Sequence, residues 1–178
     1  MEVQLELVDL TLDPRDGRAV VVLEHRASGR IFPLWVDERE AAALARASTA
    51  KATPRPDPQE LLFAVILALG AGVQRVNIAR VTGGVVHAEL RLLHGDEVVA
   101  LDARPSDAIA VALRSGAPIV VEEDLLDQVS ARVREAEARA LPASRGTGAE
   151  RLVQSPAERW NILLEHLSRE PVGPTRKA

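Results

Sequence analysis

The chain has 178 residues, of which 47% are hydrophobic and 2% aromatic, so its core must be built from aliphatic side chains. A formal net charge of −4 argues against a nucleic-acid binder that works by bulk electrostatics, and the absence of cysteine excludes disulfides and thiolate metal sites. The N-terminus does not resemble a signal peptide and no apolar run could span a bilayer, so we expect a soluble cytoplasmic protein without membrane contact.

The first part of the chain predicts three strands. Residues 2–12 alternate, but the apolar phase slips after Leu7, which predicts one strand with a bulge near that residue. Residues 13–17 are a strong turn signal, and residues 19–23 and 31–36 predict the second and third strands. We expect the first two strands to form a hairpin.

Two helices are predicted next. Asp37 and Glu40 are spaced as a capping box, and the helix after them should end near Ala47. Residues 48–56 contain two prolines and predict no regular structure, and Asp57 should cap the second helix. That helix carries an apolar stripe expected to face the core: Leu61, Leu62, Val65, Ile66 and Leu69.

The following segment predicts four more strands and two helices. The strands are residues 73–81, 85–93, 98–101 and 119–121. A helix should lie before the last strand, and another should run from Asp124 to about Leu141. Antiparallel groups of strands separated by helices predict an α+β fold, a single domain of mostly antiparallel strands packed with helices.

We expect this domain to occupy residues 1–140. Residues 141–155 are rich in Ser, Gly and Arg and predict a linker, residues 156–170 predict an appended C-terminal amphipathic helix, and residues 171–178 predict a disordered tail. Apolar stripes on the C-terminal helix and on the helix that begins at Asp124 predict a homodimer or higher homo-oligomer.

Few side chains suggest zinc binding or base stacking. The four histidines show no ligand spacing, so a zinc site is not expected. Phe32, Trp35 and Phe63 lie in apolar runs, so sequence-specific binding of single-stranded nucleic acid through aromatic stacking is not expected.

The most informative stretch is residues 102–110, DARPSDAIA, between an apolar strand and a buried helix. Two carboxylates, an arginine and a hydroxyl therefore stand at a strand-to-helix turn, where the helix N-terminus favours anions. Ser106 or Asp107 could instead cap the helix, and Asp102 could pair with an arginine, either Arg104 or Arg114. The spacing alone leaves both readings open.

This string resembles the signature of the bifunctional nuclease domain family. The following Arg114 and the run Ala117-Pro118-Ile119-Val120-Val121 extend the resemblance. Weaker matches are Leu34-Trp35-Val36 with Glu40-Ala41, and Pro54-Arg55-Pro56, so that about residues 1–135 are covered in the family's order.

The chain departs from the family's pattern at two places. Pro58-Gln59-Glu60 stands where the family usually has Thr-His-Asp, and Asp37 stands where it usually has Gly. An amide does not titrate, so Gln59 cannot replace a histidine in proton transfer.

The resemblance implies a nuclease that hydrolyses RNA and DNA with little sequence preference, assisted by a divalent cation, Mg²⁺ or Mn²⁺. It implies that Asp102 and Asp107 are catalytic and bind the metal, with Glu40 as a further ligand. Arg104 and Arg55 would grip phosphate, and Ser106 would contact substrate. The site residues that the resemblance implies are therefore Asp102, Asp107, Glu40, Arg104, Arg55 and Ser106.

The alternative is a non-catalytic ligand-binding or assembly module in which the DARPSD turn is structural. A nuclease should bring Asp102, Asp107 and at least one arginine together in an open cleft. A module should bury those side chains in mutual hydrogen bonds.

Overall fold

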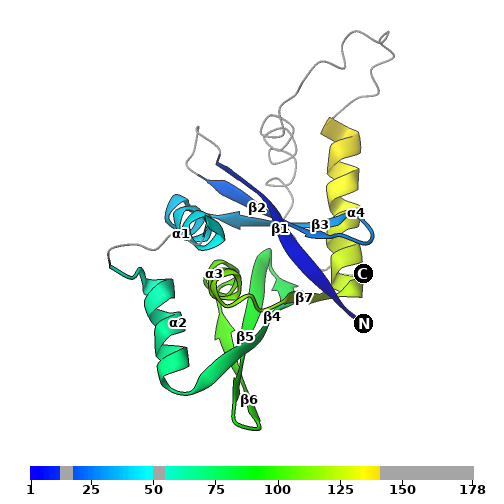
Figure 1. The fold of residues 1–178 in the computed structure, drawn as a ribbon. Coiled ribbons are helices and arrows are strands. Elements are labelled where there is room, and N and C mark those ends of the chain that lie inside the picture. The colour runs from blue at the N-terminus through cyan, green and yellow to red at the C-terminus, as the bar shows by residue number, and fades with distance from the viewer. Residues whose placement is uncertain (13–17, 50–54, 141–178) are drawn as a thin grey trace.

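A computed structural model describes residues 1–12, 18–49 and 55–140, and these form one sheet of seven strands with four helices (Figure 1). The strands are β1 (Glu2–Leu12), β2 (Ala19–His25), β3 (Arg30–Val36), β4 (Ala71–Thr82), β5 (Val85–His94), β6 (Glu97–Ala103) and β7 (Ile119–Glu122). The helices are α1 (Glu38–Thr49), α2 (Pro58–Ala68), α3 (Pro105–Ser115) and α4 (Glu123–Ala140).

The strand order is β3-β2-β1-β7-β4-β5-β6. β7 pairs antiparallel with β1 and parallel with β4, and the remaining neighbours pair antiparallel. The predicted α+β fold is therefore confirmed. The register of β1 against β2 shifts between Leu7 and Asp9, where the slip in apolar phase predicts a bulge.

Helix α3 lies at the centre of the core, because its sequence is apolar over most of its circumference. Ile109 and Val111 are fully buried, and α3 packs against α1, α2, β4 and β5. Phe32 and Leu44 complete the core on the side of β3 and α1.

Helix α4 packs against β3 and β7 through the stripe predicted for it. The side chains of Leu126, Val129, Val133 and Ala136 are buried within the monomer. The α4 stripe therefore cannot supply the dimer face that the sequence predicts, because the sheet already covers it.

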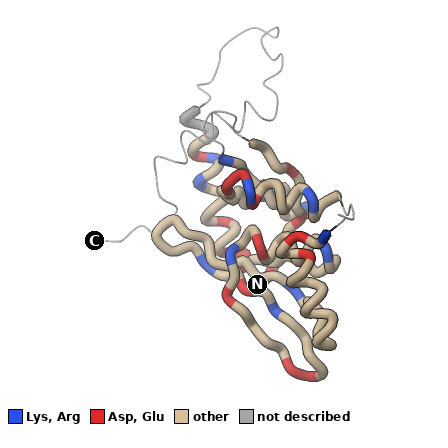
Figure 2. Tube along the Cα trace, turned by 90° about the vertical axis from the view of Figure 1, so that its left-hand side faces the viewer, with Lys and Arg blue, Asp and Glu red and all other residues tan. Residues whose placement is uncertain are grey.

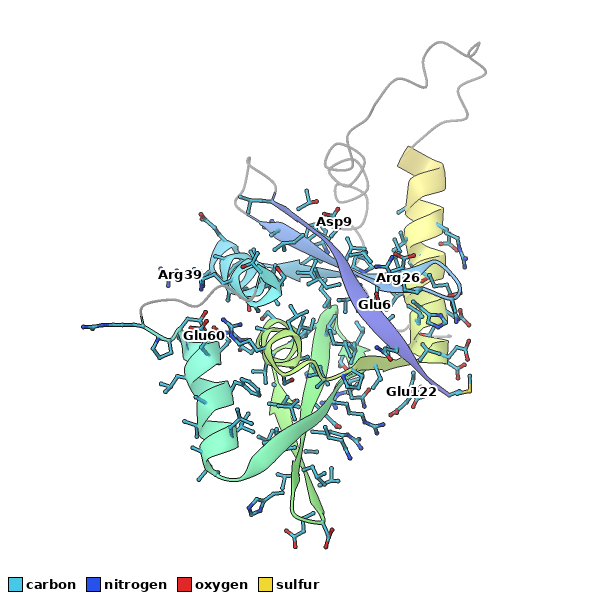
Figure 3. All side chains as sticks on the ribbon, in the orientation of Figure 1. Glu6, Asp9, Arg26, Arg39, Glu60 and Glu122 are labelled. Atoms are coloured by element: carbon cyan, nitrogen blue, oxygen red, sulfur yellow. The ribbon has the colours of Figure 1, made fainter. Side chains whose placement is uncertain are left out.

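The expectation that the α2 stripe faces the core is wrong. Leu61, Leu62, Val65 and Leu69 are exposed, and Ile66 alone of the predicted stripe is buried. The face that packs on the domain carries Gln59, Phe63 and Ile66 instead, and Glu60 in the first turn points toward α3 (Figure 3). An apolar face of α2 is thus left uncovered in the part of the chain described.

Several predicted segments lie outside the described residues. They are the turn at 13–17, the linker at 141–155, the helix at 156–170 and the tail at 171–178, and the domain boundary near residue 140 stays a prediction. Helix α1 continues to Thr49, two residues into the segment expected to lack regular structure. None of the described helices is long and apolar enough to cross a membrane.

Candidate active site at the β6–α3 turn

A cleft of about 510 Å³ opens beside the turn between β6 and α3. Strand β3, the β4–β5 hairpin, the start of α1 and one side of α4 form its other walls. Its lining is mostly apolar, with six ionisable or hydroxyl-bearing side chains: Glu40, His87, Asp102, Arg104, Ser106 and Arg132. A concave apolar cleft with a few convergent polar groups is the usual form of a ligand site.

The turn itself leaves the N-terminus of α3 without a side-chain cap. Arg104 is the N-cap residue, with extended backbone at φ −65° and ψ 142°, and Pro105 occupies the first helical position. The Arg104 side chain makes no capping hydrogen bond. The expectation that Ser106 or Asp107 caps this helix is not met, and the helix end keeps the N–H groups and partial positive charge that attract anions.

Ser106 and Glu40 join this turn to the start of α1. The buried Ser106 hydroxyl donates to Glu40 Oε1 at 2.7 Å, and Arg104 Nη1 lies 3.1 Å from the same oxygen. Glu40 Oε2 accepts the backbone N–H of Asp37, while Asp37 Oδ1 accepts the N–H of Glu40, so the predicted capping box is present. Both Glu40 oxygens therefore have protein donors.

Asp107 is also held by protein donors and does not line the cleft. Its Oδ2 accepts Arg104 Nε at 2.7 Å, and its Oδ1 accepts Gln59 Nε2 at 3.0 Å. Burial alone would raise the pKa of Asp107, but the hydrogen bonds from Arg104 and Gln59 and the charge of Arg104 outweigh it and lower the pKa. Asp107 is thus a fixed anion that orients Arg104.

Arg104 remains accessible although it contacts two carboxylates. Its side chain is 65% exposed. The hydrogen bond and charge of Asp107, together with the nearby Glu40 and Asp37, raise its pKa above the ordinary value. The guanidinium is therefore a permanent cation, held in place at the cleft and open to solvent.

Asp102 differs from the other two acidic residues. It lies at the exposed end of β6 and lines the cleft, and its carboxylate makes no hydrogen bond or ion pair with any residue that the structure describes. It does not pair with Arg104, which contacts Asp107 and Glu40, or with Arg114, which contacts Asp57 at 2.8 Å and Glu60 at 3.4 Å.

The structure thus brings four of the six predicted residues to one cleft: Asp102, Arg104, Ser106 and Glu40. Asp107 stands directly behind Arg104. Arg55 is exposed in the segment before α2 and does not line the cleft.

Three cleft residues were missed by sequence reasoning: His87, Arg132 and Trp35. Gly83 and Gly84 have φ values of 60° and 84°, as a tight hairpin requires, and the resulting ladder places Arg80 opposite His87. Across β5 and β6, Glu89 pairs with Asp102, so His87 and Asp102 share one face of the sheet. Following the register from the Gly83–Gly84 turn would have indicated His87.

The charge around the site is mixed. Figure 2 shows acidic and basic residues interleaved over the described chain rather than gathered into a surface of one sign. The cleft carries both signs, since Arg104 and Arg132 accompany Glu40 and Asp102. Long-range attraction of a polyanion is therefore weak, and a ligand must be held by local contacts.

The described residues do not form a complete set of protein ligands for a divalent cation. Within residues 1–12, 18–49 and 55–140, His, Asp and Glu side chains form no group of three or more that could hold a metal ion. Glu40 and Asp107 direct their oxygens to protein donors, which leaves Asp102 as the carboxylate with free oxygens among the three proposed ligands. A preformed cation cage does not fit this donor set.

Comparison with known proteins adds the family context. The model of the bifunctional nuclease domain matches residues 21–134. An uncharacterized protein of Mycobacterium tuberculosis is 34% identical over 125 residues, which are 70% of this chain and 74% of that protein. Bifunctional nuclease 1 of Arabidopsis thaliana is 29% identical over 133 residues, which are 73% of this chain and 41% of that protein.

Proposed function

Because this chain belongs to the bifunctional nuclease domain family, we propose that it hydrolyses phosphodiester bonds in RNA and DNA with little sequence preference. One observation carries the proposal. The carboxylate of Asp102, which has no partner among the described residues, and the exposed guanidinium of Arg104 line one cleft at the N-terminus of α3. A phosphate binds where a cation and free N–H groups meet, and a nearby carboxylate can act on water.

In this proposal the phosphodiester lies against Arg104 and the first turn of α3. Asp102 accepts a proton from water as the water oxygen bonds to phosphorus. The bond from phosphorus to the leaving oxygen breaks, and His87, which lines the same cleft, gives that oxygen a proton as general acid. Arg104 offsets the charge that develops on the phosphoryl oxygens.

The remaining signature residues have positioning roles. Asp107 fixes Nε of Arg104, and Gln59 fixes Asp107 from α2. Ser106 and Glu40 hold the start of α3 against the start of α1. The amide of Gln59 therefore supports the site through its hydrogen bond to Asp107 and takes no part in proton transfer.

A divalent cation, Mg²⁺ or Mn²⁺, stays a proposal. Asp102 would be its ligand in the cleft, and water and substrate oxygens would have to supply the other positions, as is common for Mg²⁺. When bound, the ion would lower the pKa of water and offset phosphate charge.

Cleavage of labelled single-stranded RNA and double-stranded DNA by highly purified protein tests the function. It is run with Mg²⁺, with Mn²⁺ and with chelator, beside Asp102→Asn and His87→Gln. We expect cleavage that both substitutions reduce by about 100-fold or more. Equal cleavage by all three proteins would assign the activity to a contaminant or to another site.

A non-catalytic ligand-binding or assembly module is the second candidate. The hydrogen bonds that Asp107 and Glu40 make with Arg104, Ser106 and Gln59 favour it, because such a network is sufficient to hold a structural turn. Absence of cleavage on every substrate, with and without cations, would select this function.

Homo-oligomerisation and a cytoplasmic location also remain proposals. For the dimer, the uncovered face of α2 replaces the α4 stripe as the interface, since Leu61, Leu62, Val65 and Leu69 are exposed together. A contiguous exposed apolar patch often marks a site of protein association. Sedimentation equilibrium tests the subunit number, and cell fractionation tests the location.

A further inference from the structure

Trp35 is an exposed aromatic ring in the cleft wall, not a core residue. Strand β3 alternates, so that Phe32, Leu34 and Val36 are buried on one face and Trp35 stands on the other. Trp35 is 38% exposed and lines the cleft. Its apolar neighbours in the sequence therefore do not bury Trp35, because the period-two alternation decides which face of the strand it takes.

Helix α4 covers only part of this face of β3. It packs on Ile31 through Val133 and Ala136, whereas Trp35 lies four residues farther along the strand and keeps its exposure. Val85, at the start of β5, also lines the cleft and is exposed. The cleft thus has exposed apolar surface on two of its walls.

The same cleft carries the groups suited to phosphate. Arg104 and Arg132 line it together with Trp35, and the N-terminus of α3 opens at its edge. A nucleotide combines a flat aromatic base with an anionic phosphate, so one cavity with an aromatic ring and guanidinium groups matches both parts. A cleft volume of about 510 Å³ lies in the range of sites for small ligands.

We propose that this cleft binds an unpaired nucleobase stacked on Trp35, with the adjoining phosphate at Arg104, so that single-stranded nucleic acid is the preferred substrate. This inference rests on the proposed function. In a duplex the base faces are stacked inside the helix and only the backbone is presented, so Trp35 has no partner there. The net charge of −4 also disfavours recognition by the backbone alone.

Tryptophan fluorescence tests the stacking directly. The chain has two tryptophans, so Trp160→Phe leaves Trp35 as the single reporter in the full-length protein. Three probes of equal length are titrated with chelator present: a single-stranded oligodeoxynucleotide, its duplex, and an abasic oligonucleotide with the same phosphates. We expect saturable quenching by the single strand, at least about tenfold weaker binding of the duplex, and no quenching by the abasic probe at the same concentrations.

Variants at Trp35 give a second readout by anisotropy of the labelled single strand. Trp35→Leu should weaken binding by about tenfold or more, and Trp35→Phe should keep most of the affinity, because a phenyl ring also stacks. Circular dichroism of both variants confirms that the fold is intact. Equal quenching by the abasic probe, or unchanged binding by Trp35→Leu, would overturn the stacking proposal.

Stacking and catalysis are separable in these measurements. If Asp102→Asn still shows quenching and the parent protein cleaves no substrate, the base site is supported and the nuclease function is rejected. Cleavage of single strands and duplexes at equal rates, with no quenching of Trp35, would keep the nuclease and reject the base site.

Discussion

Ser106 Oγ donates a 2.7 Å hydrogen bond to Glu40 Oε1 and so joins the first turns of α3 and α1, which are 66 residues apart in the chain. Ser106 is only 5% exposed, and Glu40 also contacts Arg104. The hydroxyl therefore holds two helix ends together at the cleft wall, which is a structural role and not that of an attacking group.

Ser106→Ala should lower the free energy of unfolding by about 1–2 kcal/mol, because a buried hydrogen bond to a charged acceptor is lost. Urea unfolding measures this change. Cleavage should fall by less than tenfold, since Glu40 keeps its contact with Arg104. Ser48→Ala is the control, because that exposed serine bonds only a carbonyl of its own helix. A stable variant without activity would give Ser106 a direct role in chemistry.

Asp102→Asn should abolish most cleavage and leave stability unchanged to within about 0.5 kcal/mol, because the carboxylate has no partner in the described structure to lose. Single-turnover cleavage and thermal unfolding measure the two effects. Glu97→Gln, an exposed carboxylate on the same strand and outside the cleft lining, should change neither. Loss of stability together with activity would show that Asp102 is a structural residue.

Asp57 predicts a pH-dependent part of the stability. Burial alone would raise its pKa, but the Glu60 N–H, a hydrogen bond from Arg46 and the charges of Arg114 and Arg46 outweigh it and lower the pKa. A carboxylate with a lowered pKa stabilises the fold above its unfolded value of about 3.9, and this contribution is lost as pH falls through the folded value.

Asp57→Asn should therefore cost about 2 kcal/mol at pH 7, where the ion pairs with Arg46 and Arg114 are present, and much less near pH 2, because asparagine still caps the helix and protonated Asp57 has lost its ion pairs. Urea unfolding from pH 7 to about pH 2 measures the convergence of the two curves. Asp96→Asn, in the exposed turn between β5 and β6, is the control and should follow the parent protein at every pH. A constant difference between Asp57→Asn and the parent would contradict the linkage.

Leu62→Asp should convert a dimer to a monomer, because it places a charge on the uncovered face of α2. Stability of the isolated monomer should change little, since Leu62 is already 41% exposed there. Analytical ultracentrifugation at micromolar concentration checks both proteins. Leu12→Asp on β1 offers an exposed leucine away from α2 and should leave the mass unchanged. A parent protein that sediments as a monomer would remove α2 as an interface.

Local patterns predicted most of the fold because they act within a few residues. The capping box at Asp37, the helix cap at Asp57 and the bulge after Leu7 all depend on short-range geometry, and all are present. The failures concern long-range packing. The faces taken by Trp35 and by the α2 stripe depend on what lies opposite each element, which periodicity alone does not state.

The candidate site also has a part that local sequence patterns predict and a part that depends on long-range packing. Residues 102–107 indicated the turn, because carboxylates beside a proline at a strand-to-helix junction form a local pattern. His87 and Arg132 reach the cleft from other elements, through strand register and helix packing. The sequence also does not predict that Asp102 lines the cleft while Asp107 lies behind it. Asp107 is held by Gln59, which comes from α2 and lies 48 residues away in the chain.

The place of β7 between β1 and β4 determines when the sheet can be completed. Val3 pairs with Val121, and Ile78 pairs with the same residue from the other side. Until residues 119–122 are synthesised, β7 cannot join strands β1 to β3 to strands β4 to β6, so β1 and β4 would each present an unpaired edge. Such edges are templates for aggregation, so nascent chains that stall before this strand are the ones most in need of a chaperone.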